Sequence, residues 1–390
     1  MAVTTNIDIV VRAFDQASQV LTGVQTKVQT LEMTAAKMQR AGVGMMVAGT
    51  AMLYPFVKAM NVYSEFENEL RNVVAISQDF ADASVGVEKF GKVFVDVASQ
   101  TKFAAAEVAE AGYAFVSRGF DFSDVESGLL PATRFAQAIK GNLIPSTELL
   151  LNTLQQYQLE MTDVSNVTDM LSVSIADSAL NMERLADSMK YVGPIAYAAN
   201  ESLSDTLASL MLLANAGIYG QQAGTVFRRM MQSILAPTRE AEKALKTVGL
   251  SSEDLTTGVN DMGDVLEKFK NRFIELGWAT LDPVTNEFRI LAQHVEDVGK
   301  VGREVFQIRA TGGFIAMLTQ GNELWEQYKH NVETAANATE KMAEVQMASL
   351  ANMVTILKDK VQALAIEIMS SNETSLKNFV QNLQDIVDWF

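Results

Sequence analysis

The residue types that perform most enzymatic chemistry are scarce in this chain. It contains no cysteine, and its only histidines are His294 and His330. Disulfides, thiolate metal sites and cysteine nucleophiles are therefore excluded, and a metal site built from several histidines is not supported. Acidic pairs remain, such as Glu65 and Glu69, whose spacing on a helix suits a general acid and a base. Such pairs arise by chance in so acidic a chain, so we expect no enzyme, no metal and no cofactor.

Two further groups could bind or activate a ligand, but each has a simpler interpretation. Arg228 and Arg229 could hold a phosphate, although neighbouring arginines are more often part of a solvated helix face. His294 stands near Glu296 and Asp297, where an exposed polar residue is simpler than a catalytic base. The phosphate-binding loop, the nucleophile elbow, the zinc-binding helix motif and the EF-hand loop are all missing from the sequence.

Length and charge narrow the class of protein further. The chain has 390 residues, 48% of them apolar and 20% charged, which suffices for two or three domains with hydrophobic cores. Its net charge is −16, and it has no cluster of Lys and Arg. Nucleic-acid binding by counterion release needs a basic face, so we expect no specific nucleic-acid binding. Twenty methionines and only six prolines are typical of a mostly helical protein.

The N-terminal part combines a predicted strand with a predicted heptad helix. Alternating apolar residues over positions 6–14 predict one short β-strand. A heptad seam follows, typical of a helix that packs on its own domain or on a second copy of the chain. Fewer than three repeats do not distinguish these two possibilities. The seam consists of Leu21, Val24, Val28, Leu31, Ala35 and Met38.

An uncharged stretch rich in glycine follows at positions 41–57. Its 17 residues reach the lower limit, about 17, for a helix that crosses a bilayer. Small residues would also allow close packing against another helix. A buried packing helix and a membrane-contact segment are both consistent with the pattern. The positions that would contact a membrane are Gly42, Gly44, Gly49, Leu53, Pro55 and Val57.

The middle of the chain shows repeated amphipathic helical periodicity with Gly and Pro between the helices. Pro131 and the step Gly193–Pro194 are predicted to interrupt helices, because proline lacks a backbone N–H. Thr238 is predicted to N-cap a helix and Gly249 to end it.

Two loops are predicted in the same region. Gly220 and Gly224 frame a loop that leads into a helix over positions 225–235, and positions 281–287 are interpreted as a turn.

The C-terminal third changes character. Positions 323–369 contain no Gly and no Pro, and one helix over these residues would be about 70 Å long. Part of such a helix should leave the globular core. A break at 370–375 precedes a last amphipathic pattern, which ends at Trp389 and Phe390, so we expect a fragment of a longer protein. A second heptad seam consists of Leu350, Val354, Leu357, Val361, Leu364 and Ile368.

Together these patterns predict an all-α fold. We expect a multi-helical globular core, long coiled-coil-like helices at both ends and one short N-terminal β-strand. The predicted domains are an N-terminal segment at 1–60, a core helical domain at 61–320 and long C-terminal helices at 321–390.

Two blocks of residues resemble the core region of phage tail tape measure proteins. One is the glycine-rich helix with its continuation, at 37–67. The other runs from Tyr-Val-Gly-Pro at 191–194 through Leu-Ala-Asn-Ala-Gly-Ile-Tyr-Gly at 213–220 to Thr-Val-Gly at 247–249. The resemblance covers roughly positions 37–318. The residues that match the family motif are Gly193, Pro194, Asn215, Gly217, Gly220, Gly224, Thr225, Arg228, Pro237 and Gly249.

The resemblance implies a non-enzymatic virion component. Three or six copies would pack inside the tail tube and set its length during assembly in the host cytoplasm. They would contact the tube protein, distal tail or baseplate hub proteins and tail assembly chaperones. They would then leave ahead of the genome and reach the host membrane.

Two alternatives stay open at this point. A membrane-active pore former or effector outside any tail would insert positions 41–57 into bilayers by itself. An enzyme with an all-carboxylate site would lose its activity on Glu65→Gln or Glu69→Gln.

Overall fold

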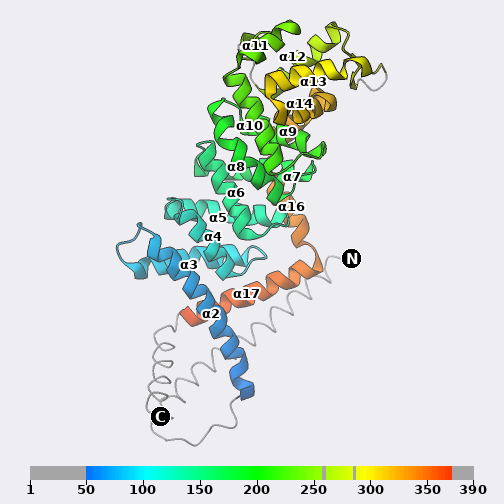
Figure 1. Ribbon diagram of the computed structural model, residues 1–390. Coiled ribbons are helices and arrows are strands. Elements are labelled where there is room, and N and C mark those ends of the chain that lie inside the picture. Colours follow the sequence, from blue (N-terminus) through cyan, green and yellow to red (C-terminus); the bar gives the residue numbers. More distant parts are fainter. Residues whose placement is uncertain (1–49, 257–260, 284–286, 371–390) are drawn as a thin grey trace, which may run out of the picture. The chain divides into compact units, whose positions relative to one another are not determined.

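The computed structural model describes residues 50–256, 261–283 and 287–370 of the chain (Figure 1). Most of these residues are helical, so the predicted all-α class is confirmed. The sheet within these ranges is one antiparallel hairpin of β1 (Ala279–Leu281) and β2 (Phe288–Ile290), and its connection falls in the predicted turn. The strand predicted at 6–14 and the heptad seam from Leu21 to Met38 lie outside the described residues.

The chain forms two compact units. The first combines residues 1–129 with 347–390. Its core contains the fully buried rings of Phe90, Phe94 and Phe115. Helix α4 can pack beside Phe94 because position 112 is a glycine, where a Cβ would lie 2.5 Å from that ring. The helices described here are α2 (Thr50–Ile76), α3 (Ala83–Ser99), α4 (Ala105–Val116), the first part of α5 (Phe122–Ala138) and α17 (Leu350–Ser370).

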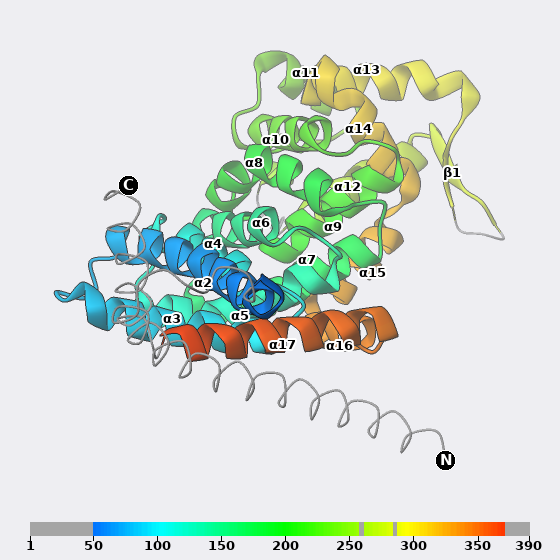
Figure 2. The ribbon, with the colours of Figure 1, turned by 90° about the horizontal axis from the view of Figure 1, so that it is seen from below.

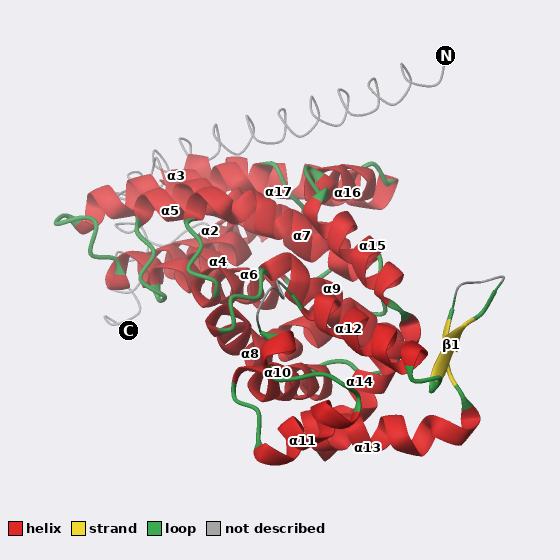
Figure 3. Ribbon diagram, turned by 90° about the horizontal axis from the view of Figure 1, so that it is seen from above, coloured by secondary structure: helices red, strands yellow, loops and turns green. Residues whose placement is uncertain are grey.

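The second unit comprises residues 130–346 and is built around α9 (Leu203–Asn215). Every residue of α9 from Leu203 to Ala214 is buried, as in a helix surrounded by others. Figures 2 and 3 show α9 among its neighbours α7, α8, α10, α12, α14 and α15. The α-helices of this unit after α5 are α6 (Leu143–Gln156), α7 (Val164–Ala176), α8 (Met182–Ala198), α9, α10 (Gln221–Leu235), α11 (Arg239–Thr247), α12 (Met262–Glu275), α13 (Val295–Phe306), α14 (Ile308–Gln320), α15 (Asn322–Glu333) and α16 (Ala338–Met347).

Two prolines that were predicted to interrupt helices lie inside them. Pro131 is within α5, and Pro194, after Gly193, is within α8. The prediction of breaks was wrong because a proline removes only one helical hydrogen bond. The carbonyl left without that bond belongs to the residue four positions earlier, Ser127 or Lys190. Both residues are exposed, so water can bond these carbonyls.

The long helix expected over 323–369 is three helices, α15, α16 and α17. The break before α16 has a tertiary cause. The buried carboxylate of Asp169 on α7 accepts the backbone N–H groups of Asn337 at 2.7 Å and Thr339 at 2.8 Å. Asn337 has a φ of +61°, which no helix interior accommodates. A side chain from α7 therefore caps α16 and ends the continuous helix that periodicity favoured.

We predict that Asp169→Ala destabilises the protein by about 1–2 kcal/mol, the usual cost of losing an N-cap. Urea unfolding followed by circular dichroism would measure it. Asp187→Ala is the control, because Asp187 is an exposed partner of Lys190 and its loss should change stability by less than about 0.5 kcal/mol. Equal effects of the two substitutions would show that the Asp169 cap does not hold α16.

Candidate functional site

The residues that could have done chemistry do not converge. His294 stacks on Trp278 and lies 2.9 Å from the carboxylate of Asp297. Arg228 faces the ring of Tyr191, whereas Arg229 donates a hydrogen bond to Gln307 at 2.7 Å. On α2, the carboxylate of Glu69 accepts hydrogen bonds from two neighbouring asparagine amides, those of Asn68 and Asn72. Within the described ranges no group of three or more His, Asp or Glu is placed to hold a metal ion.

The family-motif residues lie in the second unit, where several bring helices close together. Gly224 is inside α10, not in a loop as predicted, and a Cβ there would lie 2.4 Å from the carbonyl oxygen of Ser188 on α8. The loop prediction was wrong because this glycine is needed for helix contact, not for a turn. Gly220 (φ +62°) precedes α10, and its carbonyl accepts the Ser188 hydroxyl at 2.9 Å. At Gly193 a Cβ would lie 2.0 Å from the Oε1 atom of Gln156 on α6.

Other motif residues begin or end helices. Gly217 (φ +82°) follows α9, and Gly249 (φ +71°) follows α11, as the predicted C-terminal role of Gly249 requires. Pro237 precedes Thr238, whose side chain caps α11 by accepting the N–H of Ala241 at 3.1 Å, which confirms that prediction.

Two interactions fix the end of α9. The Asn215 side chain accepts the N–H of Ala179 at 2.8 Å and donates to the Tyr328 hydroxyl. Thr225 and Arg228 lie on α10, half-buried. The motif therefore positions the helices around α9.

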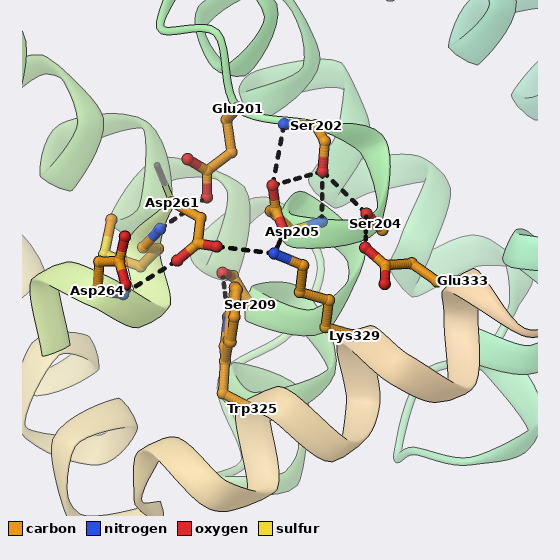
Figure 4. A network of polar contacts seen from close by, with 11 residues as sticks. Glu201, Ser202, Ser204, Asp205, Ser209, Asp261, Asp264, Trp325, Lys329 and Glu333 are labelled. Carbon is orange, nitrogen blue, oxygen red and sulfur yellow. Dashed lines mark hydrogen bonds and ion pairs between the residues drawn. The ribbon is translucent and has the colours of Figure 1, made fainter. Parts of the chain in front are cut away.

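The most distinctive polar feature of the second unit is a row of buried polar side chains on α9. Each one bonds a side chain from another helix, and three of the partners come from successive turns of α15 (Figure 4). Ser204 bonds Glu333 at 3.2 Å, Asp205 pairs with Lys329 at 2.8 Å, Thr206 accepts the Tyr157 hydroxyl at 2.7 Å, and Ser209 accepts the Trp325 indole N–H at 2.9 Å.

The Lys329 ammonium joins two buried carboxylates. Its Nζ lies 2.8 Å from Asp205 and 2.7 Å from Asp261, which also caps α12 by accepting the N–H of Asp264. Burial alone would lower the pKa of Lys329, but the hydrogen bonds and charges of the two aspartates outweigh it and raise that pKa. The lysine therefore stays charged, and its ammonium occupies the position between the two aspartates.

Glu201 is a third buried acid beside this pair. Its side chain is buried, and its Oε1 atom accepts the N–H of Met262 at 3.1 Å. Burial, and then the negative charge of Asp205, raise the pKa of Glu201 to about 8. At pH 7 Glu201 is therefore mostly protonated, so it adds no negative charge beside Asp205, Asp261 and Lys329.

Sequence reasoning missed this cluster. Its members come from three segments, around residues 201–209, 261–264 and 325–333, and no local motif links them. The available signal was the run Ser-Leu-Ser-Asp-Thr at 202–206, which places polar residues in a helix that is otherwise apolar. The side chains of this cluster bond one another across helices, so the cluster connects α9, α12 and α15.

We predict that Lys329→Met destabilises the protein by about 3 kcal/mol or more, because it leaves Asp205 and Asp261 buried without a counter-charge. The methionine retains the apolar stem of the lysine, so the loss reports the charge. Lys190→Ala, which removes an exposed ion pair, is the control and should cost at most about 0.5 kcal/mol. A Lys329→Met chain as stable as the control in urea would contradict the role of the ion pair.

We also predict that Glu201→Gln changes the pH dependence of stability. A raised folded pKa means that the contribution of Glu201 to stability is fully present below the unfolded pKa, 4.5, and is lost as pH rises through about 8. The free energy of unfolding of the unsubstituted chain should lose up to about 1.4 kcal/mol per pH unit within this window. Glutamine should remove that slope.

The measurement is urea unfolding of both chains at several values between pH 5 and 8.5. Burial also raises the pKa of Asp359 to about 6, so only the difference between the two chains reports Glu201. Parallel stability curves would show that Glu201 is ionised in the folded protein.

Comparison with known proteins identifies the family. Residues 86–282, about half of the chain, match the family described as phage-related minor tail protein. The tape measure protein of Pneumococcus phage Dp-1 is 25% identical over 353 residues, which are 90% of this chain and 29% of that protein. The probable tape measure protein of Escherichia phage P2 is 24% identical over 238 residues, 61% of this chain and 29% of that protein.

No solved structure matches this chain. The chain spans less than a third of the length of either relative. The family match covers most of the helices that surround α9, including the glycine contacts between α8 and α10. The chain therefore belongs to the phage-related minor tail protein family and is related to phage tape measure proteins.

Proposed function

We propose that this chain is part of a tape measure protein that sets the length of a phage tail during assembly. The observation that supports this most is the similarity to the Dp-1 tape measure protein over 90% of the chain. The helical fold is consistent with it, because a helix gives a fixed length per residue, about 1.5 Å. The polar clusters and glycine contacts of the described residues join helices to one another, which suits a structural role.

The finer parts of the proposal concern the assembled tail. Three or six copies would occupy the tube lumen and contact the tube protein, the distal tail or baseplate hub proteins and the assembly chaperones. The seam from Leu350 to Ile368 lies on α17 and would contribute to self-association. After ejection the protein would reach the host membrane. The acidic balance of the chain, −16, suits a protein that shares the lumen with DNA without binding it.

A membrane-active protein outside any tail was the alternative. Among the helices of the described residues, none is both long and apolar enough to cross a bilayer. Gly42, Gly44 and Gly49 of the proposed membrane-contact segment lie outside the described residues, whereas Leu53, Pro55 and Val57 belong to α2. Family membership favours the tail component, and membrane contact stays a proposal for the ejection step.

We predict that duplicating residues 350–370 in frame, within the full-length protein in its phage, lengthens the tails. The 21 residues of α17 would add about 32 Å if they extend the ruler as a helix. Electron microscopy of negatively stained virions measures tail length directly.

The control is an insertion of the same length between β1 and β2, which would lie in a hairpin connection and not in line with a helix. That insertion should leave tail length unchanged. Assembled tails of unchanged length in the duplication variant would show that α17 is not part of the ruler.

A further inference from the structure

The corner between α13 and α14 contains a strained residue. Gln307 alone separates the two helices, and its φ of +66° and ψ of +161° fall in a region that is almost restricted to glycine. The next corner, between α14 and α15, is also a single residue in the same region, but there it is Gly321, at φ +89° and ψ +155°. A glycine accepts this conformation without strain, so a glutamine at the equivalent corner needs an explanation.

The side chain of Gln307 provides one. Its Oε1 atom accepts a hydrogen bond from Arg229 on α10 at 2.7 Å, which a glycine could not form. Its carbonyl oxygen accepts the N–H groups of Ala310 and Thr311 and the Thr311 hydroxyl, which begins α14. The corner is also closed by aromatic packing, because the rings of Phe306 and Phe314 lie 4.7 Å apart on its inner side.

The sequence across the corner also fits a straight helix. Gly302, Phe306, Ala310, Gly313 and Met317 are buried and are spaced 4, 4, 3 and 4 residues apart, the spacing of one face of a continuous helix. The bent form leaves the side chain of Ile308 in water, 73% exposed. In a straight helix Ile308 would follow Val301 and Val305 on the same face, at seven and three residues.

We propose that Gln307 is the hinge of a conformational switch. Residues 295–320 have two states, the bent pair of helices described above and one continuous helix about 39 Å long. The hydrogen bond from Arg229 and the packing of Phe306 and Phe314 against each other and against Phe269 hold the bent state. Backbone strain at Gln307 and exposure of Ile308 oppose it. The switch does not depend on the proposed ruler role and can be tested without a phage.

The test is a distance measurement between two spin labels. The chain has no cysteine, so Glu296→Cys and Thr319→Cys on exposed positions of α13 and α14 give two unique labelling sites. In a straight helix the 23 residue steps from position 296 to position 319 span about 35 Å. Double electron–electron resonance would record the distance distribution in increasing urea, up to the cooperative unfolding of the chain.

Two substitutions of Gln307 should act in opposite directions. Gln307→Gly relieves the strain and disfavours a helix, so the shorter distance of the bent state should persist until unfolding. Gln307→Ala keeps the strain, loses the bond to Arg229 and favours a helix. Its population near 35 Å should be at least about five-fold larger than that of the glycine variant, because alanine and glycine differ by about that factor in a helix interior and the retained strain adds to the difference.

Arg229→Ala gives an independent comparison, because it removes the hydrogen bond and leaves residue 307 unchanged. It should also increase the population near 35 Å relative to Gln307→Gly, and it decides the question if Gln307→Ala does not fold. Circular dichroism identifies the variants that fold. An identical single distance in all folded variants up to global unfolding would show that packing alone fixes the corner, and the switch would be refuted.

Discussion

The second unit depends on one ion pair network, in which the ammonium of Lys329 lies between the carboxylates of Asp205 and Asp261. Asp205 is on α9, which is buried among other helices, so its charge has little access to bulk water. A buried carboxylate is tolerated only when a counter-charge and hydrogen bonds replace its hydration. Lys329 supplies the counter-charge for two helices at once, and thereby fixes α12 and α15 relative to α9.

The same network explains why α9 can carry polar residues in the centre of the fold. Ser204, Thr206 and Ser209 each have a partner from a neighbouring helix, so burial leaves none of these hydroxyls unsatisfied. Such contacts specify which helix lies where, whereas apolar contacts alone accept several arrangements. On the other side of the unit, Gly224 performs a related task by geometry, because it allows α10 to approach Ser188 on α8. Paired polar side chains and a glycine at a close helix contact together determine one packing of the helices.

This organisation bears on the proposed role in tails. Strong interactions surround α9, whereas the corner at Gln307 is strained, and its side chain is held by a hydrogen bond from Arg229 on α10. A protein that is built in one place and later leaves it benefits from stable units joined by parts that can rearrange. The breaks at Asn337 and Gln307 each depend on a side chain from another helix, Asp169 or Arg229. If either contact were released, the two helices that meet at that break could join into one longer helix, and their packing against each other would be lost.

The sequence by itself determined the helical class and several helix ends. Thr238 and Gly249 were identified because capping is a local matter, decided within a few residues. The tape measure relationship was also visible in the sequence, since an ordered series of short motifs spans most of the chain.

Only the tertiary structure decided the rest. Asp169 and Thr339 are 170 residues apart, so no local window of sequence shows that Asp169 separates α15 from α16. Glu201, Asp205, Asp261 and Lys329 likewise meet only after folding, and burial then decides their charges and the strength of their pairing. Pro194 continues a helix because Lys190, whose carbonyl loses its helical hydrogen bond, is exposed, which periodicity does not reveal. Local chemistry sets where helices begin and end, but burial and long-range pairing decide which of those possibilities the chain adopts.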